Sequence, residues 1–266
     1  MAARSVSICL NLKGYIMRLD RIIAVRNDKT IYRDGEYCMK VFVSGHTKSG
    51  IFAEALNQAR AEETGLPVPK LCEVTMLDGK WTIVSELIRG KSLELLSREE
   101  PEKRAQYLEA FIDLQIEVQS KDCELFPALS DKLKREIDAS EFDGGTKSGL
   151  LERLSELTSL SDAKSLCHGD FALSNVIKSE RGLYILDWSH ASAGYAAADA
   201  ARSYLLFWLS GDIDGAERYL RRFSEKSGVD AGLIRRWMPL AAASQMKRCR
   251  FAQREFLLGW VKDNNY

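Results

Sequence analysis

Three polar side chains close together in the sequence could form a magnesium site beside a base. Asp170 stands in the stretch His168-Gly169-Asp170, Asn175 follows it by five positions, and Asp187 follows Asn175 by twelve. Carboxylate and amide oxygens are ligands that suit Mg²⁺. A carboxylate on the loop before them could take the proton of an incoming hydroxyl group. The spacing therefore indicates metal-assisted chemistry on a hydroxyl.

A predicted β-hairpin positions these side chains. Residues 175–178 and 184–186 favour strands, and Arg181-Gly182 between them favours a turn. Asn175 and Asp187 fall at opposite ends of the hairpin strands, so both can face the same side. Each residue alone would suit a surface hairpin with incidental polar groups, but the combined spacing favours a functional site.

The motif HGDFALSN followed by ILDW resembles the catalytic loop and metal motif of aminoglycoside phosphotransferases and choline kinases. These families are small-molecule relatives of the protein kinases, whose loop reads H-R-D-x-x-x-x-N and whose metal motif reads D-F-G. Gly169 in place of arginine and Trp188 in place of phenylalanine point to the small-molecule branch. The resemblance implies that Asp170 is the catalytic base, and that Asn175 and Asp187 hold Mg²⁺ against the nucleotide phosphates.

The N-terminal third offers the cation and the acid that such a kinase requires. Lys40 lies in the predicted third strand, where the resemblance implies a lysine that touches the α- and β-phosphates. A lysine in mid-strand is also commonly a solvent-facing residue, and it is the C-terminal motif that favours the functional interpretation. Glu54, in the first half of the next helix, is the best candidate to hold Lys40. Glu62 and Glu63 compete with it at the helix end.

A hinge between two lobes is expected where the strand Trp81–Leu87 runs into Ile88-Arg89-Gly90. The resemblance implies that backbone groups near Glu86 and Ile88 hydrogen-bond the nucleotide base. The side chain of Glu86 is expected to be a hinge residue only.

Other residues are expected to support the catalytic loop. Asp199 lies in the apolar segment 196–209, where a charge is costly unless it is paired or hydrogen-bonded. In kinase-like folds an aspartate at this place braces the catalytic-loop backbone. Arg202 is expected to be a structural partner, and His168 to orient the loop rather than shuttle a proton.

The elements around these residues predict an α+β chain with two lobes. The first third reads as five strands with one inserted helix, and helices dominate from Ser92 onward, apart from the β insertion. The predicted strands are 21–25, 30–33, 36–43, 71–76 and 80–87, and the predicted helices include 51–63, 101–119, 129–140 and 149–160. The resemblance implies a protein-kinase-like fold, with a nucleotide-binding lobe at 1–90 and a helical lobe with the substrate site at 91–266. Residues 1–16 are expected to form a loose extension.

One departure from the protein-kinase pattern concerns the phosphate loop. The predicted first turn, Arg26 to Thr30, contains no glycine, so the Gly-rich loop of protein kinases is absent from the sequence. The stretch Gly45–Gly50 begins like a Walker A loop, but Ile51-Phe52 stand where lysine and serine or threonine are required. The missing Gly-rich loop weighs against a protein kinase more than against a small-molecule kinase, and Gly45–Gly50 is expected to be an ordinary loop.

Composition excludes several other classes. Among 266 residues, 38 are Lys or Arg and 38 are Asp or Glu, a balance that argues against a nucleic-acid-binding protein. No apolar run approaches the about 20 residues of a membrane helix. The six cysteines form no C-x-x-C pair, which favours reduced thiols in a cytoplasmic protein.

The sequence thus predicts a Mg²⁺-dependent kinase that moves the γ-phosphate of ATP or GTP to a hydroxyl of a small molecule. The alternatives are a non-catalytic nucleotide-binding regulator of the same fold and, less favoured, a protein kinase. The acceptor stays open. Asp212 and Asp214 could attract an aminoglycoside or could be helix caps, and Trp208, Trp237 and Trp260 could cage a choline or pack in the core. The sequence predicts no oligomeric state.

Overall fold

The computed structural model describes residues 21–26, 28–161 and 163–262, which form two compact units. The first unit contains the described residues up to Lys91 together with Ile177–Ser189, and the second contains Ser92–Val176 and the described residues from His190 onward. The expected loose extension, residues 1–16, lies outside the described residues.

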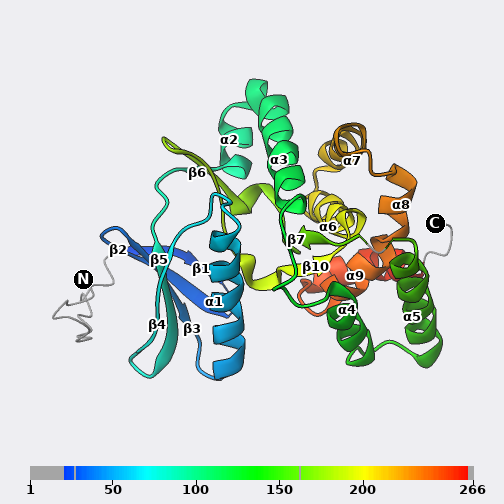
Figure 1. Ribbon diagram of the computed structural model, residues 1–266, viewed down its shortest axis with the longest axis horizontal. Coiled ribbons are helices and arrows are strands. Elements are labelled where there is room, and N and C mark those ends of the chain that lie inside the picture. Colours follow the sequence, from blue (N-terminus) through cyan, green and yellow to red (C-terminus); the bar gives the residue numbers. More distant parts are fainter. Residues whose placement is uncertain (1–20, 27, 162, 263–266) are drawn as a thin grey trace. The chain divides into compact units, whose positions relative to one another are not determined.

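The first unit is built on a five-stranded antiparallel sheet in the order β1-β2-β3-β5-β4 (Figure 1). Its strands are β1 (Arg21–Val25), β2 (Lys29–Asp34), β3 (Tyr37–Phe42), β4 (Leu71–Leu77) and β5 (Lys80–Glu86). The β4–β5 hairpin turns through Asp78 and Gly79, with φ of +46° and +71°. Positive φ at both central residues defines the type I′ turn that Asp-Gly favours. Local turn chemistry therefore fixes the strand pairing here.

One long helix, α1 (Lys48–Glu63), packs against β4 and β5 (Figure 1). It begins three residues before the predicted start at Ile51, because Thr47 caps it: the Thr47 hydroxyl accepts the Gly50 N–H at 3.2 Å. Ile51 and Ala55 then pack with Phe42 of β3 in a buried cluster. This packing sets which face of α1 looks toward the sheet.

The predicted β-hairpin near the motif is formed by β8 (Val176–Ser179) and β9 (Gly182–Ile185). Its sheet has the order β6-β8-β9, where β6 is Lys91–Ser92. The Ile185 N–H donates to the Pro67 carbonyl at 2.8 Å, which ties β9 to the chain between α1 and β4. Asp187 follows two residues later and so belongs to the first unit.

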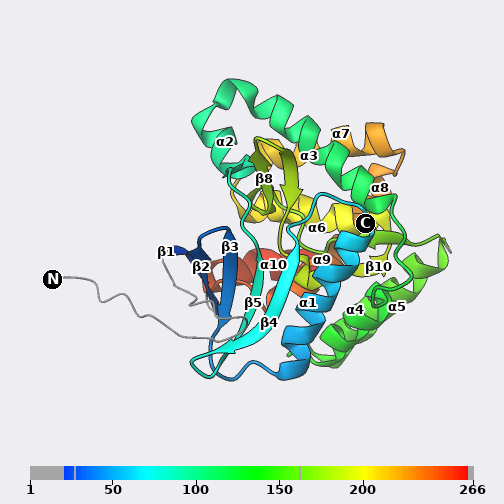
Figure 2. The same ribbon diagram turned by 60° about the vertical axis from the view of Figure 1, so that its left-hand side comes forward.

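The second unit is mainly helical, and Figure 2 shows α4 beside α5. Its core includes Phe111, whose ring contacts Phe171, Phe207 and Tyr219. The helices are α2 (Leu93–Glu99), α3 (Arg104–Gln119), α4 (Leu129–Asp138), α5 (Gly144–Ser159), α6 (Ala196–Leu209), α7 (Ile213–Ser227), α8 (Ala231–Arg236), α9 (Met238–Met246) and α10 (Arg254–Lys262). Two short strands, β7 (Ser165–Cys167) and β10 (Ser192–Gly194), pair antiparallel, and the 3₁₀ turns are η1 (Pro101–Lys103), η2 (Leu173–Asn175), η3 (Trp188–His190) and η4 (Phe251–Gln253).

Two further helix starts differ from the prediction: a side chain caps the first, whereas the second follows the 3₁₀ turn η1, so that α3 begins at Arg104 without a side-chain cap. The predicted helix from Gly149 begins at Gly144, since the Asp143 carboxylate accepts the Thr146 N–H at 2.9 Å. The predicted helix from Pro101 is preceded by the separate helix α2, which the Ser92 hydroxyl caps by accepting the Leu95 N–H. Glycine and proline near these starts obscure the caps in the sequence.

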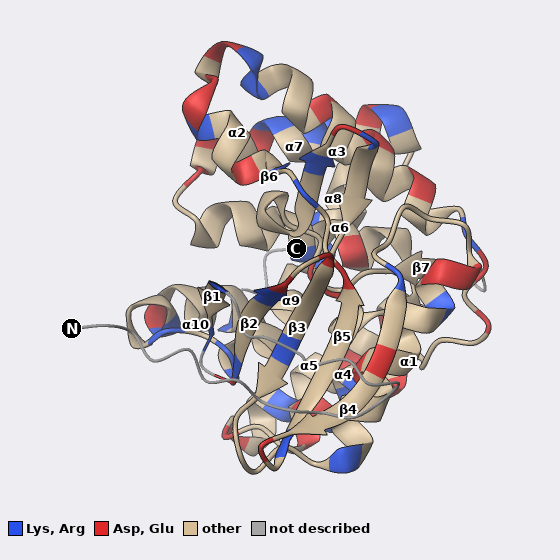
Figure 3. Cartoon of the chain, turned by 90° about the vertical axis from the view of Figure 1, so that its left-hand side faces the viewer, with Lys and Arg blue, Asp and Glu red and all other residues tan. Residues whose placement is uncertain are grey.

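Charged residues are spread over strands and helices in both units, and blue and red segments alternate along many of them in Figure 3. Among the described residues, no helix is both long and apolar enough to cross a membrane.

Candidate active site

In the first unit, the predicted lysine and glutamate form an ion pair. Lys40 lies on β3 and Glu54 on α1, and the Lys40 ammonium lies 3.0 Å from the Glu54 carboxylate. Both side chains are nearly nine-tenths buried, with 12% and 13% of their surface exposed. The competing acid Glu62 instead accepts the Leu71 N–H at the start of β4, and Glu63 is exposed.

Asp187 joins this pair. Its Oδ1 lies 3.2 Å from Lys40 Nζ. Its backbone adopts φ of +63°, in the left-handed region that non-glycine residues rarely enter. Such strain is typical of functional sites, where the surrounding structure holds it. The hairpin β8–β9 thus delivers a carboxylate to the lysine through a strained backbone.

Lys29 is a site residue that the sequence analysis missed. The sequence placed it in the turn before the second strand, whereas it begins β2 and is 7% exposed. Its ammonium lies 3.3 Å from Glu54 and 3.6 Å from Asp187, and 5.5 Å from the centre of the Phe42 ring. Lys29 pairs with Phe42 in the β2–β3 register, so it lies on the same face as Lys40. A predicted second strand that began at residue 29 would have placed Lys29 on the same face of the sheet as Lys40.

The first unit therefore holds a cluster of two lysines and two carboxylates. Burial by itself lowers the pKa of Lys40, but the charges of Asp187 and then Glu54 outweigh it and raise that pKa above its ordinary value. Lys40 stays a cation in this setting. Two ammonium groups side by side could bind an anion such as a phosphate group.

The predicted hinge runs from β5 into the segment after it. The backbone N–H of Glu86 donates to the Lys70 carbonyl, and that of Leu87 donates to the Glu36 carbonyl, each at 2.8 Å. The Glu86 side chain forms an ion pair with Arg181 at 2.6 Å. Within the described residues the Ile88 N–H donates to no backbone carbonyl, so it could donate to a nucleotide base.

In the second unit, the carboxylate of Asp170 is held from both sides. Its Oδ1 accepts a hydrogen bond from Arg202 at 3.0 Å, and its Oδ2 accepts one from the Asn175 amide at 3.2 Å. The same amide nitrogen donates to the Asp170 carbonyl at 2.9 Å. Because this nitrogen is turned toward Asp170, the amide oxygen of Asn175 points the other way, where it could hold a metal ion.

The two predicted supporting residues accept hydrogen bonds from the backbone N–H groups of Gly169 and Asp170. His168 is fully buried, and its Nδ1 accepts the Asp170 N–H at 3.2 Å. Asp199, on α6, accepts the Gly169 N–H at 2.8 Å and, through its other oxygen, the side-chain amide of Gln115 at 3.0 Å. These bonds connect the loop to a buried helix and fix the direction of the Asp170 backbone.

Gly169 explains the departure from the protein-kinase motif. It has φ of +75°, and a Cβ at this position would lie 2.5 Å from the carbonyl oxygen of His190. Real Cβ contacts are essentially never under 3.0 Å, so no other residue fits without a shift of the backbone. Arg202 completes the arrangement, because its Nε donates to the Gly169 carbonyl at 3.3 Å. Arg202 is thus a structural partner of the loop, as the sequence predicts.

Comparison with known proteins identifies the family. A family model described as the phosphotransferase enzyme family, APH, matches residues 25–240. The chain belongs to this phosphotransferase family. The expected resemblance and the expected protein-kinase-like fold, with an antiparallel sheet in the N-terminal part and helices in the C-terminal part, are both confirmed. The chain matches none of the curated proteins.

Solved structures of similar fold include aminoglycoside phosphotransferases. A thermostable mutant of APH(4)-Ia in a ternary complex with ADP and hygromycin B has a TM-score of 0.67 and 14% identity, with 91% of each chain covered. Aminoglycoside-3'-phosphotransferase of type VIII has a TM-score of 0.62 and 20% identity, covering 84% of this chain and 93% of that one. APH(3'')-Id from Streptomyces rimosus, in complex with ADP and streptomycin, has a TM-score of 0.61 and 15% identity, covering 81% and 90%.

The two residues expected to hold a metal ion, Asn175 and Asp187, offer an amide oxygen and a carboxylate. Among the described residues, no group of three or more His, Cys, Asp or Glu side chains could hold a metal ion. Asn175 and Asp187 offer only oxygen atoms, which suit a hard cation that keeps several waters and takes further ligands from substrate phosphates. The residue types therefore fit Mg²⁺. The two residues belong to different units.

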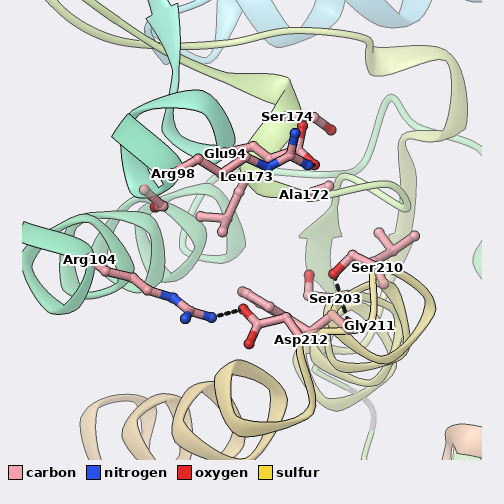
Figure 4. A pocket seen from close by; sticks show the side chains of 13 residues that line it. Glu94, Arg98, Arg104, Ala172, Leu173, Ser174, Ser203, Ser210, Gly211 and Asp212 are labelled. Atoms are coloured by element: carbon pink, nitrogen blue, oxygen red, sulfur yellow. Dashed lines mark hydrogen bonds and ion pairs between the residues drawn. The ribbon is translucent and has the colours of Figure 1, made fainter. Parts of the chain in front are cut away.

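A cavity of about 450 Å³ lies beside the catalytic loop of the phosphotransferase (Figure 4). Its lining includes Ala172–Ser174 and four charged side chains that pair with one another: Arg98 with Glu94, and Arg104 with Asp212. Asp212 also caps α7 by accepting the Gly215 N–H at 2.9 Å. The cap interpretation therefore holds for Asp212, and this cavity has no excess of acid.

The candidate cage tryptophans pack against other rings. Trp237 is 2% exposed and stacks on Tyr195, with ring centres 5.5 Å apart. Trp208 stacks on Phe256 at 5.9 Å, and Trp260 contacts Phe256 edge-on at 6.5 Å. These contacts favour a packing role over a choline cage.

Proposed function

We propose that this phosphotransferase moves the γ-phosphate of ATP or GTP to a hydroxyl group of a small molecule, with Asp170 as the catalytic base. The observation that carries the proposal is the Asp170 carboxylate, held through both oxygens by Arg202 and Asn175 in a chain of this family. A fixed carboxylate can orient an acceptor hydroxyl and take its proton.

The nucleotide would be held by the first unit and its hinge. We infer that Lys40, positioned by Glu54, contacts the α- and β-phosphates. The ion pair and its burial support this role. The Glu86 carbonyl and the Ile88 N–H would hydrogen-bond the base. Asn175 and Asp187 would hold Mg²⁺, which when bound offsets the charge that develops on the phosphates.

The proposed transfer forms one bond to phosphorus, breaks one, and moves one proton. The acceptor hydroxyl oxygen forms a bond to the γ-phosphorus, the bond from that phosphorus to the β,γ-bridging oxygen breaks, and ADP or GDP leaves. The hydroxyl proton passes to Asp170. Positioning and fixed charges supply most of the acceleration in such reactions, and the bonds from Arg202 and Asn175 would position Asp170.

The same proposal assigns the lobes and the setting. Residues 1–90 would form the nucleotide lobe and residues 91–266 the lobe with the substrate site, in a cytoplasmic protein whose partners are a nucleotide and a small hydroxylated molecule. It includes no role for nucleic acid or membrane.

The test separates nucleotide binding from transfer. Mg·ATP and Mg·GTP should raise the Tm of the protein, because a ligand at one hundred times its Kd adds about 2.7 kcal/mol of stability. Lys40→Met should abolish the shift, while Lys80→Met, an exposed lysine on β5, should keep it. Asp170→Asn should keep the shift and lower acceptor-independent ATP hydrolysis by roughly 10²-fold or more.

The outcomes distinguish a kinase from a non-catalytic nucleotide-binding regulator. A shift without any Asp170-dependent hydrolysis would favour the non-catalytic regulator. The absence of a shift with either nucleotide would contradict the proposal altogether.

A further inference from the structure

A second cavity in the helical unit lies against the catalytic loop from another direction. Its volume is about 40 Å³, and its walls come from α4, α6, α8–α9 and Gly169. Space of this size holds two or three water-sized groups, which matches the oxygens of one carboxylate or phosphate group. Lys132 and Ser244 also line a larger cavity of about 750 Å³ between α4–α5 and α9–α10, a volume that suits a small-molecule ligand.

The smaller cavity is lined by three cations and one acid. The cations are Lys132 on α4, Arg202 on α6 and the exposed Arg248 after α9. The acid, Asp199, already accepts hydrogen bonds from the Gly169 N–H and from Gln115. The lining therefore has an excess of positive charge.

The cations are held in place by neutral partners. Lys132 donates to the His190 carbonyl at 3.2 Å, and Arg248 contacts the His190 ring and donates to the Ser244 hydroxyl at 3.4 Å. Glu136, on α4, accepts a hydrogen bond from Ser244 at 2.6 Å. None of these contacts is an ion pair of Arg248 or Lys132 with a carboxylate, although the charge of Glu136 also acts on Lys132.

Arg202 contributes a buried donor that has no hydrogen-bond partner among the described residues. Its Nε and Nη2 donate to the Gly169 carbonyl and to Asp170, yet its Nη1 is buried and makes no hydrogen bond within the described part of the chain. The residue is 6% exposed. Buried charged donors are almost always satisfied, so this nitrogen indicates an acceptor that arrives with a ligand.

The pKa values report the same crowding of positive charge. Burial lowers the pKa of Lys132 to about 8; Glu136 opposes this shift, while Arg248 and Arg202 add to it. Burial, and then the charge of Arg248, likewise lower the pKa of Arg202. A bound anion would relieve this repulsion.

We propose that Arg202, Lys132 and Arg248 form an anion subsite for the acceptor, so that the acceptor of this enzyme carries a carboxylate or phosphate group as well as its hydroxyl. The assignment rests on the proposed phosphotransfer, since one guanidinium, that of Arg202, contacts both the base Asp170 and this cavity. The remainder of the acceptor occupies the adjoining larger cavity.

The positive charge of this cavity is opposite to the negative charge that an aminoglycoside site requires. A polycation needs carboxylates, and in the cavity of Figure 4 the carboxylates are paired with arginines. Bringing a cation to the cavity beside Gly169 would add to three positive charges that already repel one another. An anion gains from all three.

The first experiment uses inorganic phosphate as the probe, in the Lys40→Met background so that the lysine cluster of the other unit does not contribute. Isothermal titration should give a phosphate Kd that weakens at least tenfold in Arg248→Gln and in Lys132→Met, roughly the loss expected for one charge-assisted hydrogen bond. Lys134→Met, an exposed lysine on the same helix α4, should leave the Kd unchanged. Lys132→Arg should restore most of it.

The outcomes separate this inference from the proposed function, because phosphate binding here requires no nucleotide. Phosphate that binds Arg248→Gln and Lys132→Met as well as the parent, or does not bind the parent, overturns the anion subsite. Phosphate binding with no response to Mg·ATP in the wild type would keep the subsite and contradict the phosphotransfer.

Discussion

Replacing Glu54 with glutamine should destabilise the first unit through charge rather than packing. Glu54 is one of two carboxylates that face Lys29 and Lys40, whose side chains are only 9% and 12% exposed. Removing one partner of a buried ion pair costs about 3–5 kcal/mol. Asp187 remains 3.2 Å from Lys40 and is itself 31% exposed, so we expect the lower end, about 3 kcal/mol. At about 2–4 °C per kcal/mol for a chain of this size, the Tm falls by about 6–12 °C.

A double-mutant cycle measured by thermal unfolding checks the reasoning. Lys29→Met in the Glu54→Gln background restores one cation to one carboxylate, so it should recover about 1–2 kcal/mol. Glu63→Gln, an exposed acid on the same helix, should stay within about 0.5 kcal/mol of the wild type. If Glu54→Gln were no less stable than Glu63→Gln, or if Lys29→Met lowered the stability of both backgrounds equally, the cluster would not act as a charge-balanced unit and the argument would be refuted.

Three further predictions concern the helical unit. Gly169→Ala should lower the stability by at least about 2 kcal/mol and abolish most of the turnover, because the new Cβ adds left-handed strain and lies 2.5 Å from a backbone oxygen. Gly79→Ala is the control: φ is +71°, but its new Cβ would meet no described atom within 4 Å beyond the chain neighbours, so only the backbone strain applies. Equal losses in Tm for the two variants would contradict the steric account. Asp199→Asn should lower kcat and leave the Mg·ATP affinity unchanged. Its new NH₂ group would face the amide donor of Gln115 and so disturb the residue that holds the loop. A change in nucleotide affinity instead would show that Asp199 does not act through the loop. The pKa of Lys132 is about 8 in the folded protein and 10.5 ordinarily. Between these pH values Lys132 is protonated in the unfolded chain but not in the folded protein, so the free energy of unfolding should rise from pH 8 to 10.5. The Tm of Lys132→Met should lack that rise, and parallel pH profiles would argue against the buried lysine.

Local sequence patterns were enough to predict that Asp170 and Asn175 lie close together and that Lys40 pairs with Glu54. Asp-Gly turns and strand-length apolar runs define hairpins without reference to distant residues, and the third strand and the next helix then bring Lys40 and Glu54 together. The spacing from Asp170 to Asn175 is short enough that one turn sets both side chains. These features depend on neighbours in the sequence, so the sequence suffices for them.

Features that depend on tertiary contacts were not predictable in the same way. Lys29 becomes a site residue only through the register of β2 with β3. The early start of α1 depends on a single cap at Thr47. Nothing in the sequence near Arg202 indicates that one of its nitrogens lies buried without a hydrogen-bond partner in the described part of the chain, or that Lys132 and Arg248 line the same cavity.

The first unit is discontinuous in the sequence, and this has a consequence for how the protein is made. Lys40 and Asp187 are separated by 147 positions, so a ribosome working at about 5–20 residues per second would need about 7–30 s to supply the second carboxylate after the lysine. During that interval Lys29 and Lys40 share Glu54 alone. We expect the sheet to remain incompletely stabilised until β8 and β9 arrive, and a nascent chain stalled before residue 177 to be a better substrate for chaperones and proteases than one released at full length.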